Sequence, residues 1–200
     1  MNPLDPDPES KILAADITVR LYREMIRNQD QAAIASLVQT RFEERYLNPV
    51  LDSSTKHGFT VLAVCCLMVE ALESFRQGSP KTKGTSEGAF RSFFQAYAEF
   101  QELQPVAHEF YVNVRNGILH QAETTGGWRV HRQSGPLYKK EGTARWISAS
   151  EFAERLKRVL VAYCETLKNS EWQSPVWSKA RTKLKDICRN CGVADVKELD

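Results

Sequence analysis

The sequence predicts an all-α fold, a helical bundle of about seven helices with a small inserted β-hairpin. Apolar residues recur every three or four positions along most of the chain, which is the period of a helix packed on one face. Ser or Asp residues that favour helix N-termini precede several of these stretches. The 200 residues, 42% hydrophobic and 26% charged, suit one domain over residues 1–200 with a disordered tail at residues 1–9.

The first three helices are expected between residues 10 and 77. Ser10 and Asp30 are suitable N-caps for the first and second, because their side-chain oxygens can accept from free backbone N–H groups. His57–Gln77 is apolar nearly all round, which predicts the central helix of the bundle. A basic, glycine-containing loop follows at residues 78–85. The apolar stripes of the first two helices are Leu13, Ile17, Leu21 and Met25, and Ile34, Leu37, Val38 and Phe42.

Two more helices are expected before the hairpin. Ser86 starts the fourth helix, and Pro105 suits the first turn of the fifth, where its missing N–H is not needed. The fifth should end near His120, because the chain then becomes polar and reaches two glycines. Its apolar stripe is Val106, Phe110, Val114 and Ile118.

The hairpin and the last two helices complete the chain. Two strand-like pieces, Trp128–Arg132 and Ala144–Ser148, flank a polar, glycine-containing stretch and predict the hairpin. Ser148 to Glu151 has the capping-box pattern that opens a sixth helix. Ser174-Pro175 opens a seventh, for which Gly192 is a natural stop.

Bulk composition favours no particular partner. The formal net charge is only +2, from 27 Lys and Arg against 25 Asp and Glu, so total charge neither supports nor excludes a nucleic acid. The acidic, proline-rich N-terminus lacks the basic and apolar regions of a secretory signal. The longest apolar run, Phe59–Val69, is too short to cross a bilayer, so no membrane association is expected. Cys65 and Cys66, adjacent in an apolar helix, favour a reducing, cytoplasmic location.

Common cofactor and metal motifs are missing from the sequence. It contains no phosphate-binding glycine loop, no HExxH pair and no Gly-x-Ser-x-Gly turn. Cys188 and Cys191 form a single CxxC pair, which is half of a four-ligand zinc site. We interpret them as half-buried thiols near a helix end, with zinc as the minor alternative. We therefore expect neither a cofactor nor a metal.

The segment Tyr111–His120 concentrates the candidate chemistry. On a helix, Asn116 and His120 lie one turn apart on the same face. The Cβ of Arg115 points away from that face, but its long guanidinium can reach the same patch at the helix end. Gly117 removes a side chain, which would permit the close approach of another helix or a substrate.

These side chains suit cleavage of an RNA backbone without a metal. A histidine can take a proton from a hydroxyl or give one to a leaving oxygen. An arginine offers a fixed fork of donors to phosphate oxygens, an asparagine can orient either group, and the 2′-hydroxyl of RNA is an internal nucleophile. The alternative is a helical scaffold without a ligand, in which the three residues coincide by chance and the helix dipole alone favours the histidine.

The segment Arg115-Asn-Gly-Ile-Leu-His120 resembles the R-x(4–6)-H motif of the HEPN superfamily (higher eukaryotes and prokaryotes nucleotide-binding). It has the short, four-residue spacing, with a polar residue directly after the arginine. The string RNGILHQAETTGGWRV also resembles a subset of bacterial HEPN-like proteins in which a small hairpin follows the motif helix. The resemblance covers roughly Phe59 to Lys168, and the first two helices and the last add little to it.

The resemblance implies a metal-independent endoribonuclease of a toxin–antitoxin, defence or stress system, acting as a homodimer with a composite site. It assigns Arg115 and His120 as the catalytic pair and Asn116 as the supporting polar residue. Some such families add an acidic residue on an earlier helix, for which Glu70 is the candidate. A carboxylate in so apolar a helix needs a partner such as Arg115, or else lies at a solvated margin. The resemblance also allows a non-catalytic HEPN-like module that binds RNA, a nucleotide or a partner protein. Regulation would come from a separate antitoxin or regulatory protein.

The hairpin region carries the clearest RNA-binding signal. Between Trp128 and Ile147, five basic side chains stand against Glu141 alone, and three aromatic residues lie among them. This mixture suits single-stranded RNA through phosphate contacts and base stacking, although aromatics packed on the bundle would give the same pattern. The basic loop offers a weaker set, Arg76, Lys81 and Lys83. The expected RNA-binding residues are Arg129, Arg132, Lys139, Lys140 and Trp128.

Overall fold

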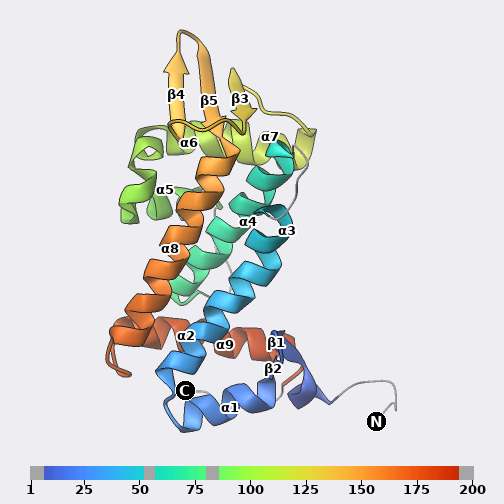
Figure 1. The fold of residues 1–200 in the computed structure, drawn as a ribbon, viewed down its shortest axis with the longest axis vertical. Helices are drawn as coiled ribbons and strands as arrows, with labels where there is room; N and C mark the ends of the chain where they lie inside the picture. Colours follow the sequence, from blue (N-terminus) through green and yellow to red (C-terminus); the bar gives the residue numbers. More distant parts are fainter. Residues whose placement is uncertain (1–6, 52–56, 80–85, 194–200) are drawn as a thin grey trace. The chain divides into compact units, whose positions relative to one another are not determined.

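The computed structural model describes residues 7–51, 57–79 and 86–193. The chain is a mostly α-helical bundle with two small sheets, which confirms the predicted fold class (Figure 1). Seven α-helices in the described ranges have six residues or more. The described residues group into two compact units, one within Met1–Glu44, Ser74–Lys81 and Val161–Asp200, the other within Arg45–Glu73 and Thr82–Leu160. A single domain over residues 1–200 stays a prediction.

The first unit begins differently from the prediction. Ser10 caps no helix, because its hydroxyl donates to the carbonyl of Asp7 at 2.6 Å within the 3₁₀ turn η1 (Pro8–Ser10). The strands β1 (Ile12–Ala14) and β2 (Ile17–Thr18) then pair antiparallel, since β-branched residues favour extended backbone. The helix starts only at α1 (Val19–Arg27), where the Thr18 hydroxyl accepts a backbone N–H of the first turn.

Two segments that were expected to be loose fall partly outside the described residues. They are positions 1–6 of the tail and positions 80–85 of the basic loop, which include Lys81 and Lys83. The rest of the tail is attached to α1, because Asp7 pairs with Arg20 at 3.1 Å and Glu9 pairs with Arg23 at 3.0 Å.

The other helices of the first unit follow the predicted caps. α2 (Gln31–Phe42) starts at Asp30, whose side chain accepts a backbone N–H at 2.9 Å. α9 (Pro175–Asn190) starts after Ser174, and the chain leaves it at Gly192 with φ of +90°. Glycine adopts this left-handed conformation without strain, so the predicted stop is confirmed.

The second unit contains the candidate site. The predicted fifth helix is divided, because Pro105 lies in a 3₁₀ helix and the following segment widens into a π-helical turn. The buried stripe of this region contains Phe110 and Val114 as predicted, but Gly117 takes the place of Ile118. The helical elements are the C-terminal part of the π-helix η2 (Glu43–Leu47), α3 (Asn48–Leu51), most of α4 (Gly58–Gln77), α5 (Ser86–Ala96), η3 (Ala98–Val106), α6 (Ala107–Phe110), η4 (Tyr111–Arg115), α7 (Asn116–Gln121) and the N-terminal part of α8 (Ala149–Asn169).

A hairpin is present in this region, but it does not pair the two predicted strands. The strand order of this sheet is β3 (Trp128–His131), β5 (Ala144–Ser148), β4 (Tyr138–Glu141). β4 and β5 form the antiparallel hairpin, whereas β3 runs parallel to β5. Thus the two predicted strands are parallel neighbours. The hairpin turn is the two-residue link after Glu141, where Gly142 has φ of +58°, as tight hairpin turns require.

An aromatic cluster joins the helical segment α6–η4–α7, which we call the motif helix, to the three-stranded sheet and to α8. The rings of Phe110 and Phe152 stack with centroids 5.6 Å apart, and Trp128 packs edge-on against Phe110 at 5.9 Å. Each of these rings is almost fully buried. The beginning of the motif helix is therefore fixed by packing. The phenylalanines of the cluster are Phe90, Phe93, Phe94, Phe100, Phe110 and Phe152.

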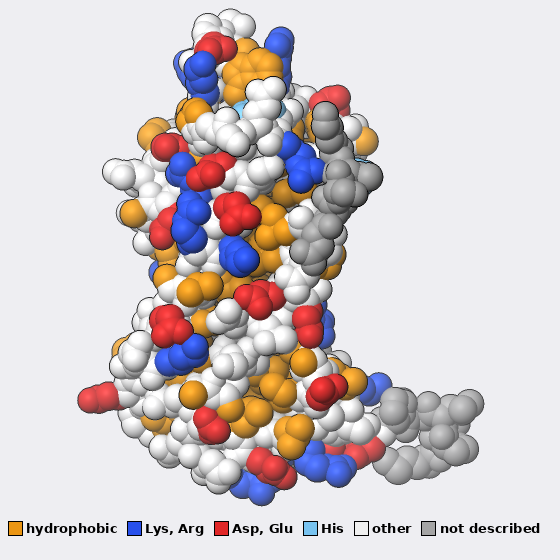
Figure 2. Space-filling model, viewed as in Figure 1, with side chains coloured by type: hydrophobic (Ala, Val, Ile, Leu, Met, Phe, Trp, Pro, Cys, Tyr) orange, Lys and Arg blue, Asp and Glu red, His pale blue; other side chains and the backbone are white. Residues whose placement is uncertain are grey.

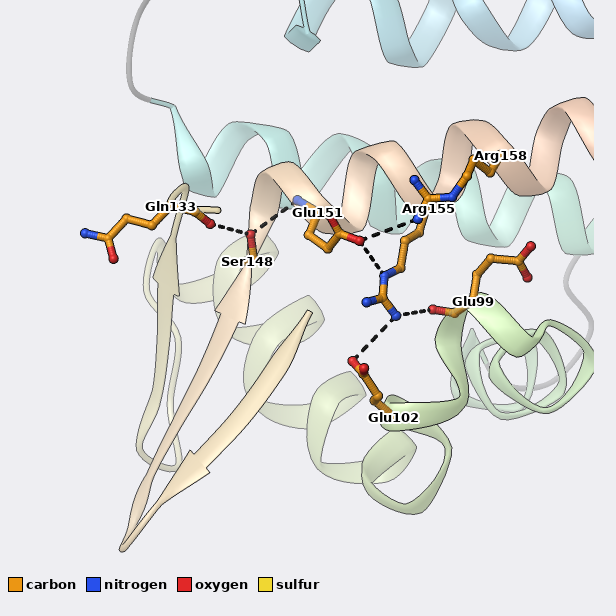
Figure 3. A network of polar contacts seen from close by, with 7 residues as sticks. All are labelled: Glu99, Glu102, Gln133, Ser148, Glu151, Arg155 and Arg158. Carbon is orange, nitrogen blue, oxygen red and sulfur yellow. Dashed lines mark hydrogen bonds and ion pairs between the residues drawn. The ribbon is translucent and has the colours of Figure 1, made fainter. Parts of the chain in front are cut away.

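Polar contacts fix the start of α8 and the loop after β3 (Figure 3). Ser148 is the N-cap: its hydroxyl accepts the Glu151 N–H at 3.2 Å and donates to the Gln133 carbonyl at 3.3 Å. Arg155 binds the Glu151 carboxylate at 2.8 Å and donates to the Glu99 carbonyl at 2.7 Å. The predicted cap at Ser148 is confirmed, and the same hydroxyl ties the Gln133 loop to the helix.

One described helix, α4, is long and apolar enough to cross a membrane when judged by length and composition alone. A little over half of its most apolar stretch is buried inside the fold, and the core helix of a soluble protein passes the same test. Its fully buried side chains include Leu62, Val69 and Leu72, as expected for the predicted central helix.

Candidate functional site

The structure brings Arg115 and Glu70 together. Arg115 closes the π-helical turn η4, and its Nε and Nη2 both lie 2.9 Å from Glu70 Oε1 on α4. The two side chains are only 14% and 15% exposed. The sequence left two alternatives for Glu70, pairing with Arg115 or a position at a solvated margin. In the structure, Glu70 pairs with Arg115. Because the pair is nearly buried, the carboxylate holds the guanidinium in one orientation.

Asn116 is the second contact of the guanidinium. Arg115 Nη1 donates to Asn116 Oδ1 at 3.1 Å, and the guanidinium carbon lies 5.6 Å from the centre of the Tyr111 ring. A guanidinium has five N–H hydrogens, and three are directed at Glu70 and Asn116. Among the residues that the structure describes, the other two donors have no partner and could bind an anion such as a phosphate group.

His120 lies one turn beyond Asn116 on α7 and is exposed to solvent. Within the described ranges, no hydrogen bond or ion pair joins it to Arg115, Asn116 or Glu70. The site thus has a fixed arginine and an accessible histidine on consecutive turns. This arrangement leaves the imidazole available to a ligand.

Gly117 has a different role from the predicted one. A Cβ at this position would collide with the carbonyl oxygen of Glu123, and the Glu123 N–H donates to the Gly117 carbonyl at 3.3 Å. The missing side chain thus accommodates the chain's own return after α7. The expectation that Gly117 admits another helix or a substrate is therefore wrong.

Asn113 is a structural neighbour of the site that the sequence analysis missed. Its Nδ2 donates to the Glu109 carbonyl at 2.9 Å, and its Oδ1 accepts the Thr125 hydroxyl at 2.8 Å. A Cβ at Gly126, which has φ of +59°, would collide with the Asn113 side chain. The available signal was an amide side chain within an otherwise apolar stretch, because buried amides require partners.

The predicted RNA-binding residues do not share one surface, because Trp128 is buried and the basic residues lie on both faces of the sheet. Trp128 is 3% exposed and packs on Phe110, so it cannot stack on a base, and this assignment is corrected. Trp146 is partly exposed instead, with Arg129 over its ring at 5.2 Å. Figure 2 shows hydrophobic side chains flanked by Lys and Arg over the three-stranded sheet.

The remaining basic residues of the set also differ in their contacts. Lys139 forms an ion pair with Glu141, whereas Lys140 belongs to the opposite face of the same strand. Arg132 contacts the Ser150 hydroxyl at 3.5 Å. Lys139 and Lys140 are both well exposed, so the hairpin has solvated charge on both of its faces.

The cysteines and acidic residues supply no metal cluster in the described part of the chain, where no group of three His, Cys, Asp or Glu could hold an ion. Cys188 is fully buried, Cys191 is partly buried, and both are free thiols. Burial raises the pKa of Cys188 and of Cys65 to about 12, and raises that of Cys66 well above its ordinary value. These three thiols are therefore protonated at neutral pH and poor nucleophiles.

No protein family model, curated protein sequence or solved structure matches the chain.

Proposed function

We propose that this protein is a metal-independent endoribonuclease of the HEPN type that acts as a homodimer. The observation that carries the proposal is the guanidinium of Arg115, five residues before the exposed His120. Glu70 and Asn116 hold it, and two of its donors have no partner among the described residues. A fixed cation can stabilise the charge that develops on a phosphate in phosphodiester transesterification, and an accessible imidazole can transfer a proton in it.

In the proposed step, one phosphorus–oxygen bond forms, another breaks, and two protons are transferred. The RNA 2′-oxygen attacks the adjacent phosphorus while a base takes its proton, and the bond to the 5′-oxygen breaks as an acid protonates that oxygen. The products are a 2′,3′-cyclic phosphate and a 5′-hydroxyl, with no change of oxidation state. Arg115 would stabilise the charge that develops on the non-bridging oxygens, and His120 would act as base or acid.

A homodimer supplies what one chain lacks. The step uses a base and an acid, and each motif offers one histidine, so a two-fold axis would provide the second. Leu67 on α4 and Val112 in the π turn support such an interface, because they are 45% and 41% exposed. They lie about one turn from Glu70 and Arg115, so apolar surface flanks the site.

A second candidate is a non-catalytic HEPN-like module that binds RNA, a nucleotide or a partner protein. The observation in its favour is that most of the Arg115 guanidinium is already engaged and buried. In either case, we propose that an antitoxin or regulatory protein controls the activity in a toxin or defence system.

The deciding experiment is cleavage of single-stranded RNA in EDTA, with analysis of the product ends. His120→Ala should lower cleavage at least ~100-fold and change the free energy of unfolding by only about ±0.5 kcal/mol, because the side chain is exposed. The matched control is His108→Ala, since His108 is an exposed histidine on α6 that pairs with Glu87. Products with 3′-hydroxyl ends and strict dependence on magnesium or manganese would falsify the mechanism. RNA binding without cleavage would favour the non-catalytic module.

A further inference from the structure

One face of the three-stranded sheet presents an aromatic side chain between two basic ones. The strand register places Arg129 of β3, Trp146 of β5 and Lys139 of β4 next to one another across the sheet. Side chains alternate along a strand, so Lys140, which is paired with Arg145, belongs to the opposite face. We call the side with Arg129, Trp146 and Lys139 the Trp146 face.

A cavity of about 370 Å³ opens on the Trp146 face. Its volume lies within the range of small-ligand sites, about 300–1000 Å³. A second cavity, of about 630 Å³, shares His131 and Gln133 with the first and adds Arg132 to its wall. The residues that line the first cavity are Trp146, Lys139, Glu141, His131, Gln133, Ser134 and Pro136.

The loop after β3 forms one wall of this cavity through Gln133, Ser134 and Pro136. This wall is held in position, because the Gln133 carbonyl accepts the Ser148 hydroxyl at 3.3 Å. The Gln133 side chain points away from that contact (Figure 3).

The chemistry of the wall matches a nucleotide. The indole of Trp146 is a flat platform on which any base can stack. Arg129 lies over the ring but does not line the cavity, so it fixes the indole without filling the space. The Lys139 side chain is 57% exposed, so its ammonium can reach a phosphate at the cavity rim, where it would exchange its ion pair with Glu141 for the phosphate.

We infer that the Trp146 face binds single-stranded RNA, with one base against Trp146 in the smaller cavity and its phosphate at Lys139. The second cavity, with Arg132, would take the next nucleotide, which favours a strand over a free mononucleotide. The inference rests on the proposed function and deepens it, because it names the surface that holds the substrate.

The test uses the full chain and a fluorescent 2′-O-methyl oligoribonucleotide, which lacks the nucleophile and cannot be cut by transesterification. Trp146→Leu, which keeps an apolar side chain but removes the π face, should weaken binding about 5- to 160-fold, the range for loss of one stacked base. Trp146→Phe should restore most of the affinity. Lys139→Ala should reduce the salt dependence of binding by about 0.7 in log–log slope, whereas the matched control Lys140→Ala should leave it unchanged.

Several outcomes would overturn the inference. They are no binding by the wild-type chain, equal effects of Lys139→Ala and Lys140→Ala, and unchanged affinity in a folded Trp146→Leu variant. Competition by AMP as strong as that by the oligonucleotide would overturn the assignment to a strand. Cleavage of unmodified RNA is measured in parallel, so the two proposals separate. Probe binding through Trp146 without cleavage refutes only the nuclease, and cleavage that ignores Trp146 refutes only this surface.

Discussion

The ion pair between Glu70 and Arg115 gives the most direct test of the candidate site. Glu70→Ala would leave the guanidinium without a carboxylate that is now 2.9 Å from two of its nitrogens. Removing one partner of a buried pair costs about 3–5 kcal/mol, and the slight exposure of both side chains places this pair near the lower end, at about 3 kcal/mol. In a chain of this length, 1 kcal/mol lowers the Tm by about 2–4 °C, so the Tm should fall by about 6–12 °C.

Glu70→Gln separates charge from position. The amide oxygen can still accept from Arg115, so the loss should be about 1–1.5 kcal/mol, the difference between charged and neutral hydrogen bonds. Cleavage per folded molecule should accordingly fall less in Glu70→Gln than in Glu70→Ala. Both quantities come from thermal melts followed by circular dichroism and from cleavage rates corrected for the folded fraction.

The matched control is Glu87→Gln. Glu87 also binds an arginine, Arg91, at 2.8 Å, but that arginine is 58% exposed. Hydrogen bonds from Arg91 and His108 lower the pKa of Glu87, so the carboxylate is ionised in the same neutral buffer. Water and salt screen this pair, and its loss should change the Tm less than Glu70→Gln does. Equal changes for the two variants would refute the argument that burial strengthens the Glu70 pair. Normal cleavage by folded Glu70→Ala would show that Arg115 needs no carboxylate for activity.

Two further predictions concern the same unit and its proposed dimer. Gly117→Ala should destabilise the fold by roughly 1–3 kcal/mol, the usual effect of overpacking, because the new methyl would collide with the loop carbonyl that follows α7; an unchanged Tm would show that the loop can move away. Leu67→Glu should convert the proposed dimer to a monomer in light scattering and remove cleavage while leaving the melt intact. The control Val161→Glu introduces the same charge at another exposed apolar position and should leave dimer and cleavage unchanged. A Leu67→Glu dimer that still cleaves RNA would exclude this interface.

Elements with a local cause could be predicted from the sequence. Asp30, Ser148 and Gly192 act at helix ends through hydrogen bonds or backbone conformations confined to a few neighbouring residues. Ser10 has the same chemistry, but its hydroxyl bonds within an earlier turn, and the next residues pair as β1 and β2. The competing extended structure depends on strand pairing, which a capping pattern does not report.

The site was predictable only in part, because its contacts join distant segments. Glu70 and Arg115 are 45 positions apart, and the sequence left pairing and solvent exposure of Glu70 as equal alternatives. Trp128 and Trp146 both looked suited to stacking. Their difference arises from the strand register, which pairs Trp146 with Arg129 and so places the two indoles on opposite faces. A register between strands separated by a loop cannot be derived from composition or spacing.

The link between the motif helix and the sheet bears on how the two proposals work together. The Thr125 hydroxyl and N–H both bond Asn113 of the π turn, and the Thr124 hydroxyl donates to the Trp128 carbonyl at the start of β3. Backbone contacts at Gly117 hold the same loop against α7. The sheet is therefore attached to the helix that carries Arg115 through several short hydrogen bonds. Under the two proposals, a strand bound on the Trp146 face would keep a fixed register relative to Arg115. Thr125→Val, which removes the hydroxyl that bonds Asn113, should therefore alter which phosphodiester is cut, read from the product ends, more than it alters affinity.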